Sequence, residues 1–322
     1  MARKALSPAR LAVVQAVEGQ REHLTGPVRI GLSGGADSLA LVAAAAHCRL
    51  DAEAVVIDHQ LQDGSGAIAE HAAATARALG LLARVQRVHV EIDGQGLESA
   101  ARTARLDALA DGATVLLGHT LDDQAETVLL GLGRGSGARS MQGMPSIQPW
   151  ATGALARPLL GLRRTTTRQA CRDQGLEVWD DPMNDDPRFR RVRVRHDLVP
   201  LMDDVLGGGV VEALGRTASL LREDGALLDE LAAAAEAGCR AGDGLRVDAL
   251  VAQPMALRSR VVRSWLVGRG VVEPSQGHVL AVLELVGRWH GQRGVDLPGG
   301  IRVRRDNGIL LASPRPLASP NG

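Results

Sequence analysis

The sequence predicts an α/β protein in which a doubly wound parallel sheet is followed by a second, smaller, mainly helical domain. Short apolar runs alternate with helix-length segments through the first half of the 322-residue chain, and this alternation is typical of a parallel sheet covered by helices on both faces. Three consecutive glycines at residues 207–209 interrupt the pattern, which favours a domain boundary. We therefore expect a first domain over residues 1–206 and a second over residues 207–322.

Local signals define the expected elements in chain order. Ser7-Pro8 is typical of a helix N-cap followed by proline at the first helical position. Asp306-Asn307-Gly308 lies between two apolar runs and predicts a β-hairpin turn near the C-terminus. The expected strands of the first domain are 28–32, 54–57, 85–92 and 114–118, and its expected helices are 37–47, 65–79, 98–110 and a segment beginning near 121. In the second domain, residues 210–237 are expected to form one helix or a pair of helices, and further helices are expected at 255–267 and 278–289.

The composition favours a reducing compartment and not a membrane. Lys and Arg together number 37, as do Asp and Glu, so net charge by itself indicates no partner. The three cysteines, Cys48, Cys171 and Cys239, are far apart and odd in number, which argues against a disulfide framework, a zinc site or a cysteine-pair redox mechanism. Apolar runs are much shorter than the roughly 20 residues that span a bilayer. We expect a cytoplasmic protein without a membrane partner.

The stretch from Val28 to Ser38 predicts a phosphate-binding loop between a buried strand and a helix. Gly34 and Gly35 allow a tight turn and a close approach of the backbone to a ligand, because no Cβ intervenes. The turn leads onto a helix N-terminus, where free N–H groups and the helix dipole favour an anion. The residues expected to form this phosphate-binding loop are Ser33, Gly34, Gly35, Ala36, Asp37 and Ser38.

This loop fits neither of two common nucleotide-binding motifs. A Walker A loop needs a lysine near its end, and the chain's single lysine is Lys4. The spacing from Gly31 to Gly35 does not match the Rossmann G-x-G-x-x-G pattern. Ser33–Ser38 instead resembles the S-G-G-x-D-S loop of the ATP pyrophosphatase (PP-loop) superfamily. That resemblance implies cleavage of ATP between its α- and β-phosphates and adenylylation of an oxygen.

Polar residues follow three of the expected strands, at the sheet edge where ligands bind in folds of this class. They are Ser33, Asp58-His59 and His119. His119 begins a segment in which Asp122, Asp123 and Glu126 share one face of a helix. These acids could bind Mg²⁺ together with phosphates, or receive a cationic substrate. Alternatively, Thr120-x-x-Asp123 fits a capping box, in which acids serve only to stabilise a first helical turn.

Several further motifs follow the PP-loop in a defined order. With the loop they are Ser33–Ser38, Ile57-Asp58-His59, Glu98-x-x-Ala101-Arg102-x-x-Arg105, His119-x-x-Asp122-Asp123-Gln124-x-Glu126-Thr127, Arg134-Gly135-Ser136-Gly137, Arg157-Pro158-Leu159-Leu160, and Asp181-x-x-Asn184-x-Asp186 with Arg191-x-x-x-Arg195. In this order they resemble the bacterial tRNA(Ile)-lysidine synthetases over roughly residues 25 to 205. The PP-loop marks only the superfamily, whereas its combination with the His119 and Arg134 motifs is much more specific.

The resemblance implies a two-step ligation on a transfer RNA. The C2 oxygen of cytidine 34, in the CAU anticodon of tRNA(Ile), would attack the α-phosphate of ATP and release pyrophosphate. The ε-amine of free L-lysine would then displace AMP and give lysidine, which pairs with A instead of G. The implied cofactors are ATP and Mg²⁺, and the implied partners are tRNA(Ile) and L-lysine. A homodimer is compatible with the sequence.

The resemblance also implies roles for single residues. The implied catalytic residues are Asp37, Asp123, Glu126 and His119. Asp37 and Asp123 are the candidate Mg²⁺ ligands, and Asp123 and Glu126 are also candidates for binding the lysine amine. Asp58 and His59 join the loop as implied ATP-binding residues. Contacts with tRNA or phosphate are expected from Arg102, Arg105, Arg134, Arg191 and Arg195, and the glycine-rich segment 131–150 is expected to be a mobile lid.

Two alternative functions stay open on the sequence. A tRNA thiolase of the same superfamily would share the loop, but such enzymes usually need cysteines near the site, and none of the three cysteines lies in a motif. A non-catalytic adenine-nucleotide-binding module would explain the loop but not the clustered acids or the arginines.

From Arg240 to the C-terminus twelve arginines accompany six acids, which favours contact with RNA phosphates.

Overall fold

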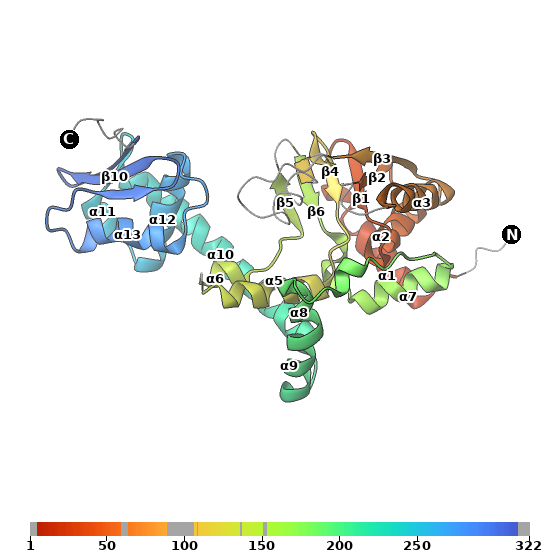
Figure 1. Cartoon of the computed structure of the whole chain (residues 1–322). Coiled ribbons are helices and arrows are strands. Elements are labelled where there is room, and N and C mark those ends of the chain that lie inside the picture. The colour runs from red at the N-terminus through yellow and green to blue at the C-terminus, as the bar shows by residue number, and fades with distance from the viewer. Residues whose placement is uncertain are drawn as a thin grey trace. The chain divides into compact units, whose positions relative to one another are not determined.

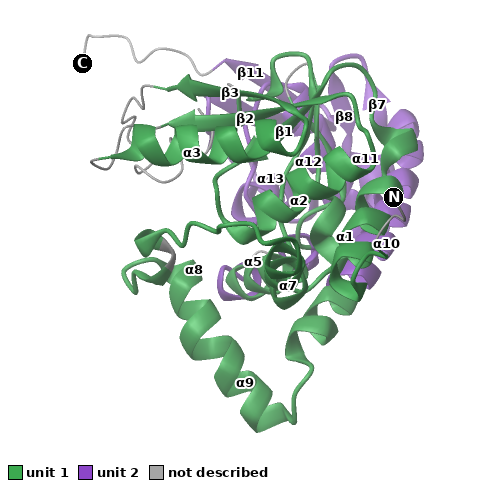
Figure 2. Cartoon of the chain, turned by 90° about the vertical axis from the view of Figure 1, so that its right-hand side faces the viewer, with its two compact units in different colours: residues 1–130, 143–217 green, residues 131–142, 218–322 purple. Residues whose placement is uncertain are grey.

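The computed structural model describes residues 5–58, 64–88, 106–107, 109–135, 137–150 and 153–314. The chain divides into two compact units, one of residues 1–130 and 143–217 and the other of residues 131–142 and 218–322 (Figure 2). It therefore enters the second unit briefly, returns to the first, and then completes the second. Element labels follow Figure 1.

The first unit contains a six-stranded sheet in the order β3-β2-β1-β4-β6-β5 (Figure 1). The strands β3, β2, β1, β4 and β6 are parallel to their neighbours, and the edge strand β5 is antiparallel to β6. The bounds are β1 Val28–Leu32, β2 Ala52–Asp58, β3 Leu82–Arg87, β4 Thr114–Leu116, β5 Ile147–Trp150 and β6 Gly153–Ala156. The predicted parallel sheet is confirmed.

Both faces of this sheet are buried, as the doubly wound prediction requires. Successive side chains of a strand point to opposite faces, and in β2 Ala54 and Val56 belong to one apolar core while Val55 belongs to another. The first core includes residues of α1, α2, α3 and α7, and the second includes Leu106 and Leu109. The helices among the described residues of this unit are α1 Pro8–Glu18, α2 Ala36–His47, α3 Ser65–Ala78, α5 Leu121–Gly133, α7 Arg164–Gln174, α8 Arg190–Arg193 and α9 Val199–Leu206.

The strand order reverses between β1 and β4. The chain runs outward from β1 to β2 and β3, then returns to the other side of β1 as β4. In open α/β sheets ligands bind beyond the carboxyl ends of the strands at such a reversal. The loop after β1 and the loop after β4 both lead away from this point, so the fold brings together the two segments with the strongest sequence motifs.

The segment 131–150, which we expected to be a mobile lid, contains regular secondary structure in its described residues. It contains the end of α5, the short helix α6 (Ala138–Met141) and the edge strand β5. The Ser140 hydroxyl donates to the carbonyl oxygens of Gly131 at 3.1 Å and Gly137 at 2.8 Å. These hydrogen bonds stabilise the connection between α5 and α6, in which Gly131 and Gly137 lie. Residues 147–150 form β5 and pair with β6. The expected helix over residues 98–110 lies largely outside the described residues.

The second unit combines helices with a five-stranded antiparallel sheet in the order β7-β8-β11-β10-β9. The predicted hairpin is confirmed: Asp306 pairs with Ile309, and Asn307 and Gly308 have φ of 45° and 78°, as a two-residue Asn-Gly turn requires. Strands β7, β8 and β9 were not predicted, because two or three residues are too few to show alternation. The bounds are α10 Val210–Cys239, β7 Arg240–Ala241, β8 Gly244–Arg246, α11 Val247–Val251, α12 Met255–Gly268, α13 Gln276–Gly287, β9 Val295–Leu297, β10 Ile301–Asp306 and β11 Ile309–Pro314; α10 begins in the first unit.

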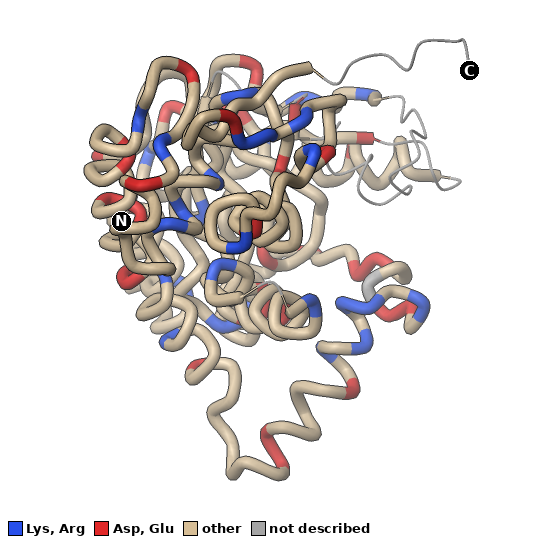
Figure 3. The backbone as a smooth tube through the Cα atoms, turned by 90° about the vertical axis from the view of Figure 1, so that its left-hand side faces the viewer, with Lys and Arg blue, Asp and Glu red and all other residues tan. Residues whose placement is uncertain are grey.

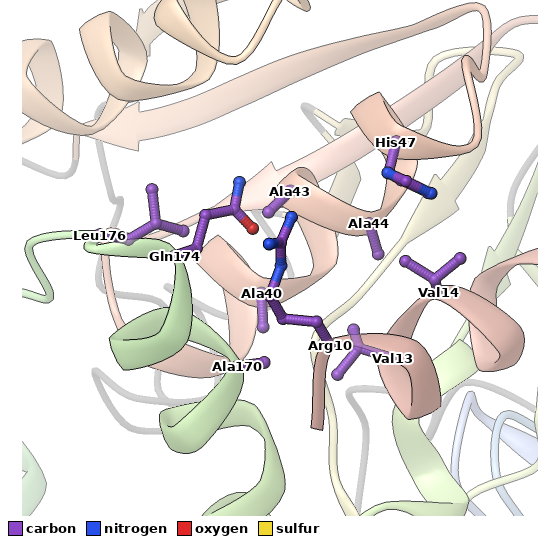
Figure 4. Close-up of a pocket in the computed structure, with 10 residues that line it drawn as sticks. All are labelled: Arg10, Val13, Val14, Ala40, Ala43, Ala44, His47, Ala170, Gln174 and Leu176. Atoms are coloured by element: carbon purple, nitrogen blue, oxygen red, sulfur yellow. The ribbon is translucent and has the colours of Figure 1, made fainter. Parts of the chain in front are cut away.

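A small cavity lies among α1, α2 and α7 (Figure 4). Its volume is about 10 Å³, and Arg10, His47 and Gln174 line it together with alanines and valines. Such a space is about the size of one water molecule, so it is a gap in packing and not a nucleotide site. Within the described parts of the chain, no helix is both long enough and apolar enough to cross a membrane.

Candidate functional site

The PP-loop is the turn Ser33-Gly34-Gly35 between β1 and α2. Gly34 has φ of 85°, in the left-handed region that favours glycine. The Ser38 hydroxyl donates to the Gly35 carbonyl oxygen at 2.9 Å and accepts the Ser33 N–H at 3.2 Å, which closes the turn over the start of the helix. Ser33 itself is exposed. The loop therefore presents the exposed Ser33, whose hydroxyl lies 3.2 Å from the Ser38 hydroxyl, at the start of a helix, which is a favourable site for phosphate.

Two close backbone approaches hold this loop in place. The Trp179 N–H, in the segment after α7, donates to the Gly34 carbonyl oxygen at 3.1 Å. On the other side, a Cβ on Gly118 would lie 2.9 Å from the carbonyl carbon of Asp37 and 3.0 Å from the Ser38 nitrogen. The chain leaving β4 thus passes directly against the first turn of α2. This contact brings the segment that begins at His119 next to the PP-loop.

Three carboxylates of the first unit converge on one guanidinium, that of Arg164. Its Nε lies 3.3 Å from Asp37 Oδ2, its Nη2 lies 2.7 Å from Asp123 Oδ1, and its Nη1 lies 3.5 Å from Glu126 Oε1. We call Asp37, Asp123 and Glu126 the acid cluster. Asp123 and Glu126 lie in the first two turns of α5, and Asp37 lies in the first turn of α2. The strand reversal between β1 and β4 therefore brings the acid cluster together.

The pKa values of Asp37 and Asp123 shift in opposite directions. Burial raises the pKa of Asp37 and outweighs the opposing effects of the Thr167 hydrogen bond and the Arg164 charge. Burial would also raise the pKa of Asp123, but the charge of Arg164 and hydrogen bonds from Thr120 lower it below its usual value. Asp123 is therefore firmly ionised at neutral pH, whereas Asp37 binds a proton more readily than an exposed aspartate does.

Asp123 serves both of the roles considered from the sequence. Its Oδ2 accepts the backbone N–H and the hydroxyl of Thr120, each at 2.8 Å, which stabilises the start of α5 as part of a capping box does. Its Oδ1 contacts Arg164 instead. Helix capping and membership of the acid cluster are thus compatible, because each uses a different oxygen.

Two predicted arginines adjoin the acid cluster. Arg195 contacts Glu126 through Nε at 2.8 Å and Nη2 at 3.3 Å, and Arg191 donates to the Thr127 hydroxyl at 3.4 Å. Arg195 lies in a π-helical turn, residues Val194–Leu198. Such turns are frequent at functional sites, because they shift side chains out of the regular helical register.

Other predicted site residues do not contact Arg164 or lie outside the described residues. Asp58 is buried at the end of β2, where it accepts the Ser65 hydroxyl at 2.7 Å at the start of α3. His119 is half-buried, and its charge contributes to the lowered pKa of Asp123 after the larger effects of Arg164 and Thr120. Arg134 is exposed in the turn after α5 and belongs to the second unit. Outside the described residues are His59, Arg102 and Arg105.

Three residues of this site were not predicted from the sequence: Arg163, Arg164 and Thr167. Arg163 pairs with Asp122 at 3.2 Å and with Glu212 at 2.7 Å, while the buried Thr167 hydroxyl donates to Asp37. One signal could have revealed the arginines. They occupy the N-cap and first position of α7, where positive charge opposes the helix dipole, so acids from elsewhere in the fold had to compensate them.

Replacing Thr167 by valine should destabilise the first unit by about 1 to 3 kcal/mol, because the partly buried Asp37 carboxylate loses a hydrogen-bond donor. The folded-state pKa of Asp37 lies above its unfolded value, so ionised Asp37 lowers stability at neutral pH. Loss of the donor enlarges that cost. The difference from wild type should therefore shrink as the pH falls and Asp37 becomes protonated, and urea unfolding at several pH values measures it. The exposed Thr165→Val is the matched control; equal effects of both variants would contradict the role of Thr167.

The acid cluster fits Mg²⁺ only with help from a nucleotide. Among the described residues no group of three or more His, Cys, Asp or Glu side chains is arranged to hold a metal ion. Mg²⁺ in phosphoryl-transfer sites is commonly bound by one or two carboxylates with phosphate oxygens and waters. Asp37 lies beside the phosphate-binding loop and Asp123 shares Arg164 with it, so these two carboxylates suit such a partial ligand set.

Comparisons with known proteins agree with this geometry. Residues 12–202 match the family model described as the PP-loop domain, and residues 245–311 match the TilS substrate binding domain. The tRNA(Ile)-lysidine synthase of Nocardia farcinica is 55% identical over 288 residues, which cover 87% of this chain and 88% of that protein. The tRNA(Ile)-lysidine synthase of Leifsonia xyli subsp. xyli is 51% identical over 336 residues, which cover 97% of this chain and 99% of that protein.

A solved structure is similar in fold. The U34-tRNA thiolase NcsA from Methanococcus maripaludis, with its 4Fe-4S cluster, has a TM-score of 0.51 and 15% identity, over 66% of this chain and 80% of that chain. At that identity the likeness shows only a shared fold. The sequence matches extend over nearly the whole chain and include both the PP-loop domain and the substrate binding domain. The chain therefore belongs to the tRNA(Ile)-lysidine synthase family.

Proposed function

We propose that this protein ligates L-lysine to C2 of cytidine 34 in the CAU anticodon of tRNA(Ile), while ATP is converted to AMP and pyrophosphate. The observation that carries the proposal is the acid cluster beside the PP-loop, in a chain about half identical to proteins named tRNA(Ile)-lysidine synthase. The loop suits a polyphosphate anion, and the carboxylates suit a cation. The reaction needs both, because it joins an adenylylated base to an amino acid with a cationic side chain. We propose a cytoplasmic location, where tRNA, ATP and lysine occur together.

In the first step the C2 oxygen of cytidine attacks the α-phosphorus of ATP, and the bond to the bridging oxygen breaks. Ser33, the N–H groups of the loop and the N-terminus of α2 are proposed to bind the departing pyrophosphate. Bound Mg²⁺ neutralises phosphate charge in reactions of this kind, and we propose Asp37 and Asp123 as its protein ligands. Arg191 and Arg195 adjoin the acid cluster, which favours contact with the α-phosphate over contact with the tRNA backbone.

In the second step the lysine ε-nitrogen attacks C2 of the adenylylated cytidine, and AMP leaves with the C2 oxygen. The ε-amine is protonated in water and must lose a proton before it can attack. We propose that Asp123 and Glu126 bind the ammonium, and that a carboxylate of the acid cluster accepts the proton as attack proceeds. Glu126 suits the binding role because its side chain is only 2% exposed, so water competes little for the ammonium.

We propose that an arginine cluster of the second unit binds tRNA phosphates. Basic and acidic positions are interspersed along the chain (Figure 3), so their distribution alone does not locate the contact. The pairing of individual arginines with acids indicates it instead. Arg139 and Arg260 share the single carboxylate of Asp229, at 3.2 and 3.0 Å. Burial and the charges of Arg139 and Arg260 lower the pKa of Arg263. Three guanidiniums thus accompany one acid, and an RNA phosphate would relieve their repulsion. Arg134 is a further proposed contact.

Changing Arg139, Arg260 and Arg263 together to glutamine should weaken tRNA binding and flatten its salt dependence by up to about one unit of slope per arginine, because fewer counterions are released. Binding is measured by filter binding or fluorescence anisotropy across a series of salt concentrations. Arg302→Gln is the matched control, since Arg302 lies in the same unit but forms a balanced pair with Asp296 at 2.6 Å. A triple variant with the wild-type slope would argue against this site.

One assay tests the proposed function against the thiolase alternative. The full chain is incubated with ATP, Mg²⁺, an unmodified tRNA(Ile) transcript and labelled L-lysine, and label is expected to enter the tRNA with release of AMP. A thiolase would need a reactive thiol, but burial raises the pKa of Cys171, which adjoins the start of α2, to about 11, and a thiol at that pKa is a poor nucleophile. Absence of label in tRNA would contradict the proposal.

A further inference from the structure

Arg164 fills the centre of the acid cluster. Each of its guanidinium nitrogens contacts a different carboxylate, and its side chain is 17% exposed. Burial alone would lower the pKa of this arginine, but the charges of Asp123, Asp37 and Glu126 raise it. The carboxylates proposed to receive a cation therefore already hold one, and it stays charged at any physiological pH.

A second cation has little room while Arg164 stays in place. Arg195 contacts Glu126 at 2.8 Å and approaches Asp123 at 3.8 Å, so two guanidiniums already pair with three carboxylates. An ammonium added to this group would lie within contact distance of a like charge in a poorly hydrated site, where repulsion is strong. Lysine can therefore bind to Asp123 and Glu126 only if a resident cation moves away.

We propose that Arg164 is a stand-in cation: it occupies the lysine ammonium subsite in the free protein and turns to the phosphates of ATP when nucleotide binds, so that lysine binds after ATP. The inference rests on the proposed function, because it takes the acid cluster as the lysine subsite. Arg164 is thus a positioning residue that sets the order of binding. Lysine is needed only once the cytidine is adenylylated, so this order suits the chemistry.

The position of Arg164 makes the exchange short. Its Nε contact is with Asp37, the second residue of α2, and the N-terminus of α2 forms the phosphate-binding end of the loop. A guanidinium also suits phosphate better than an ammonium does, because its planar fork can donate two parallel hydrogen bonds. When Arg164 moves from carboxylates to phosphate, the incoming ammonium replaces the charge that it withdraws. These charges thus have partners both in the free protein and when ATP and lysine are bound.

Calorimetric titration of the full chain with L-lysine tests the proposal. Lysine affinity is measured with and without α,β-methylene-ATP, in which the bond to be cleaved is blocked. Wild type should bind lysine at least about tenfold more tightly with the analogue, which is a coupling between two sites. Arg164→Gln should bind lysine without nucleotide about as tightly as wild type binds it with the analogue. Equal wild-type affinities in both conditions, or a folded Arg164→Gln that no longer binds lysine, would overturn the proposal.

Two more variants sharpen the test. Arg168→Gln is the matched control, because Arg168 lies one turn further along α7 in an exposed pair with Asp180 at 2.8 Å; it should keep the wild-type coupling. If Arg164→Gln does not fold, Arg164→Lys decides, since an ammonium keeps the charge but cannot contact all three acids. Its coupling should fall at least about threefold, and an unchanged coupling would overturn the proposal.

The ligation assay with labelled lysine separates the two proposals. Wild type that modifies tRNA without nucleotide-dependent lysine binding would refute only the role of Arg164. Wild type that does not modify tRNA would refute the proposed function itself. The comparison uses the full chain throughout, so neither result depends on isolating one unit.

Discussion

Asp37→Asn should reduce tRNA-dependent pyrophosphate release by about 10²- to 10³-fold, the usual effect of removing one electrostatic contact to a developing charge. Asp37 is the second residue of α2, directly after the PP-loop, and its carboxylate accepts Thr167 and contacts Arg164 at 3.3 Å. Asparagine keeps the shape and can still accept from Thr167, but it loses the negative charge proposed to bind Mg²⁺. Release of pyrophosphate from ATP labelled at its γ-phosphate measures the effect.

The affinity for tRNA should be unchanged in this variant, because Asp37 belongs to the nucleotide subsite. Asp51→Asn, at an exposed position just before β2, is the matched control and should release pyrophosphate at the wild-type rate. Wild-type activity in Asp37→Asn would refute the assigned role. A parallel loss of tRNA binding would instead indicate that the substitution disturbs the first unit as a whole.

Asp123→Asn should reduce lysine transfer by at least about 10²-fold. It should leave tRNA-dependent pyrophosphate release within about tenfold of wild type, because Asp37 and the phosphates remain as ligands for Mg²⁺. The Asp123 carboxylate is kept ionised by Arg164 and Thr120, so it is the strongest fixed negative charge available to the lysine ammonium. Asparagine preserves an acceptor for Thr120 and hence the start of α5. Adenylylated tRNA should therefore accumulate, and it can be detected by label from ATP labelled at its α-phosphate.

The two half-reactions also decide between the two roles proposed for Asp123. Loss of pyrophosphate release together with lysine transfer would assign this carboxylate to the metal and phosphates, not to lysine. Asp111→Asn, in the exposed turn before β4, controls for the loss of one negative charge. Thermal unfolding of each variant is measured alongside, because breaking a buried ion pair can cost about 3 to 5 kcal/mol.

Much of the fold followed from local patterns. The strands β1, β2 and β4 each appear as short apolar runs, and α2, α3 and α5 follow such runs in the order expected of a doubly wound sheet. The Asn307-Gly308 turn was predictable because only a few residues adopt positive φ at low cost. These features depend on neighbours a few residues apart, which is the range over which a sequence pattern can be read directly.

Other elements were hidden for physical reasons. The glycines of residues 131–150 gave no sign of the short helix α6, in which the Ser140 hydroxyl donates to the carbonyl oxygens of Gly131 and Gly137. The edge strand β5 contains Pro149, which is tolerated at a sheet edge but weakens the sequence signal for a strand. Short strands of the second unit depend on pairing with β10 and β11, which no local pattern encodes.

By itself the sequence determined the PP-loop, the acids that follow β4 and the order of strands and helices, since each is a pattern of near neighbours. Only the tertiary structure decided that Arg164 lies among these acids. Asp37 and Arg164 are 127 residues apart, and their contact exists because α7 packs against α1 and α2 in a shared apolar core. Burial then makes every charge in the site depend on a partner from another element, and such pairing arises only when the chain is folded.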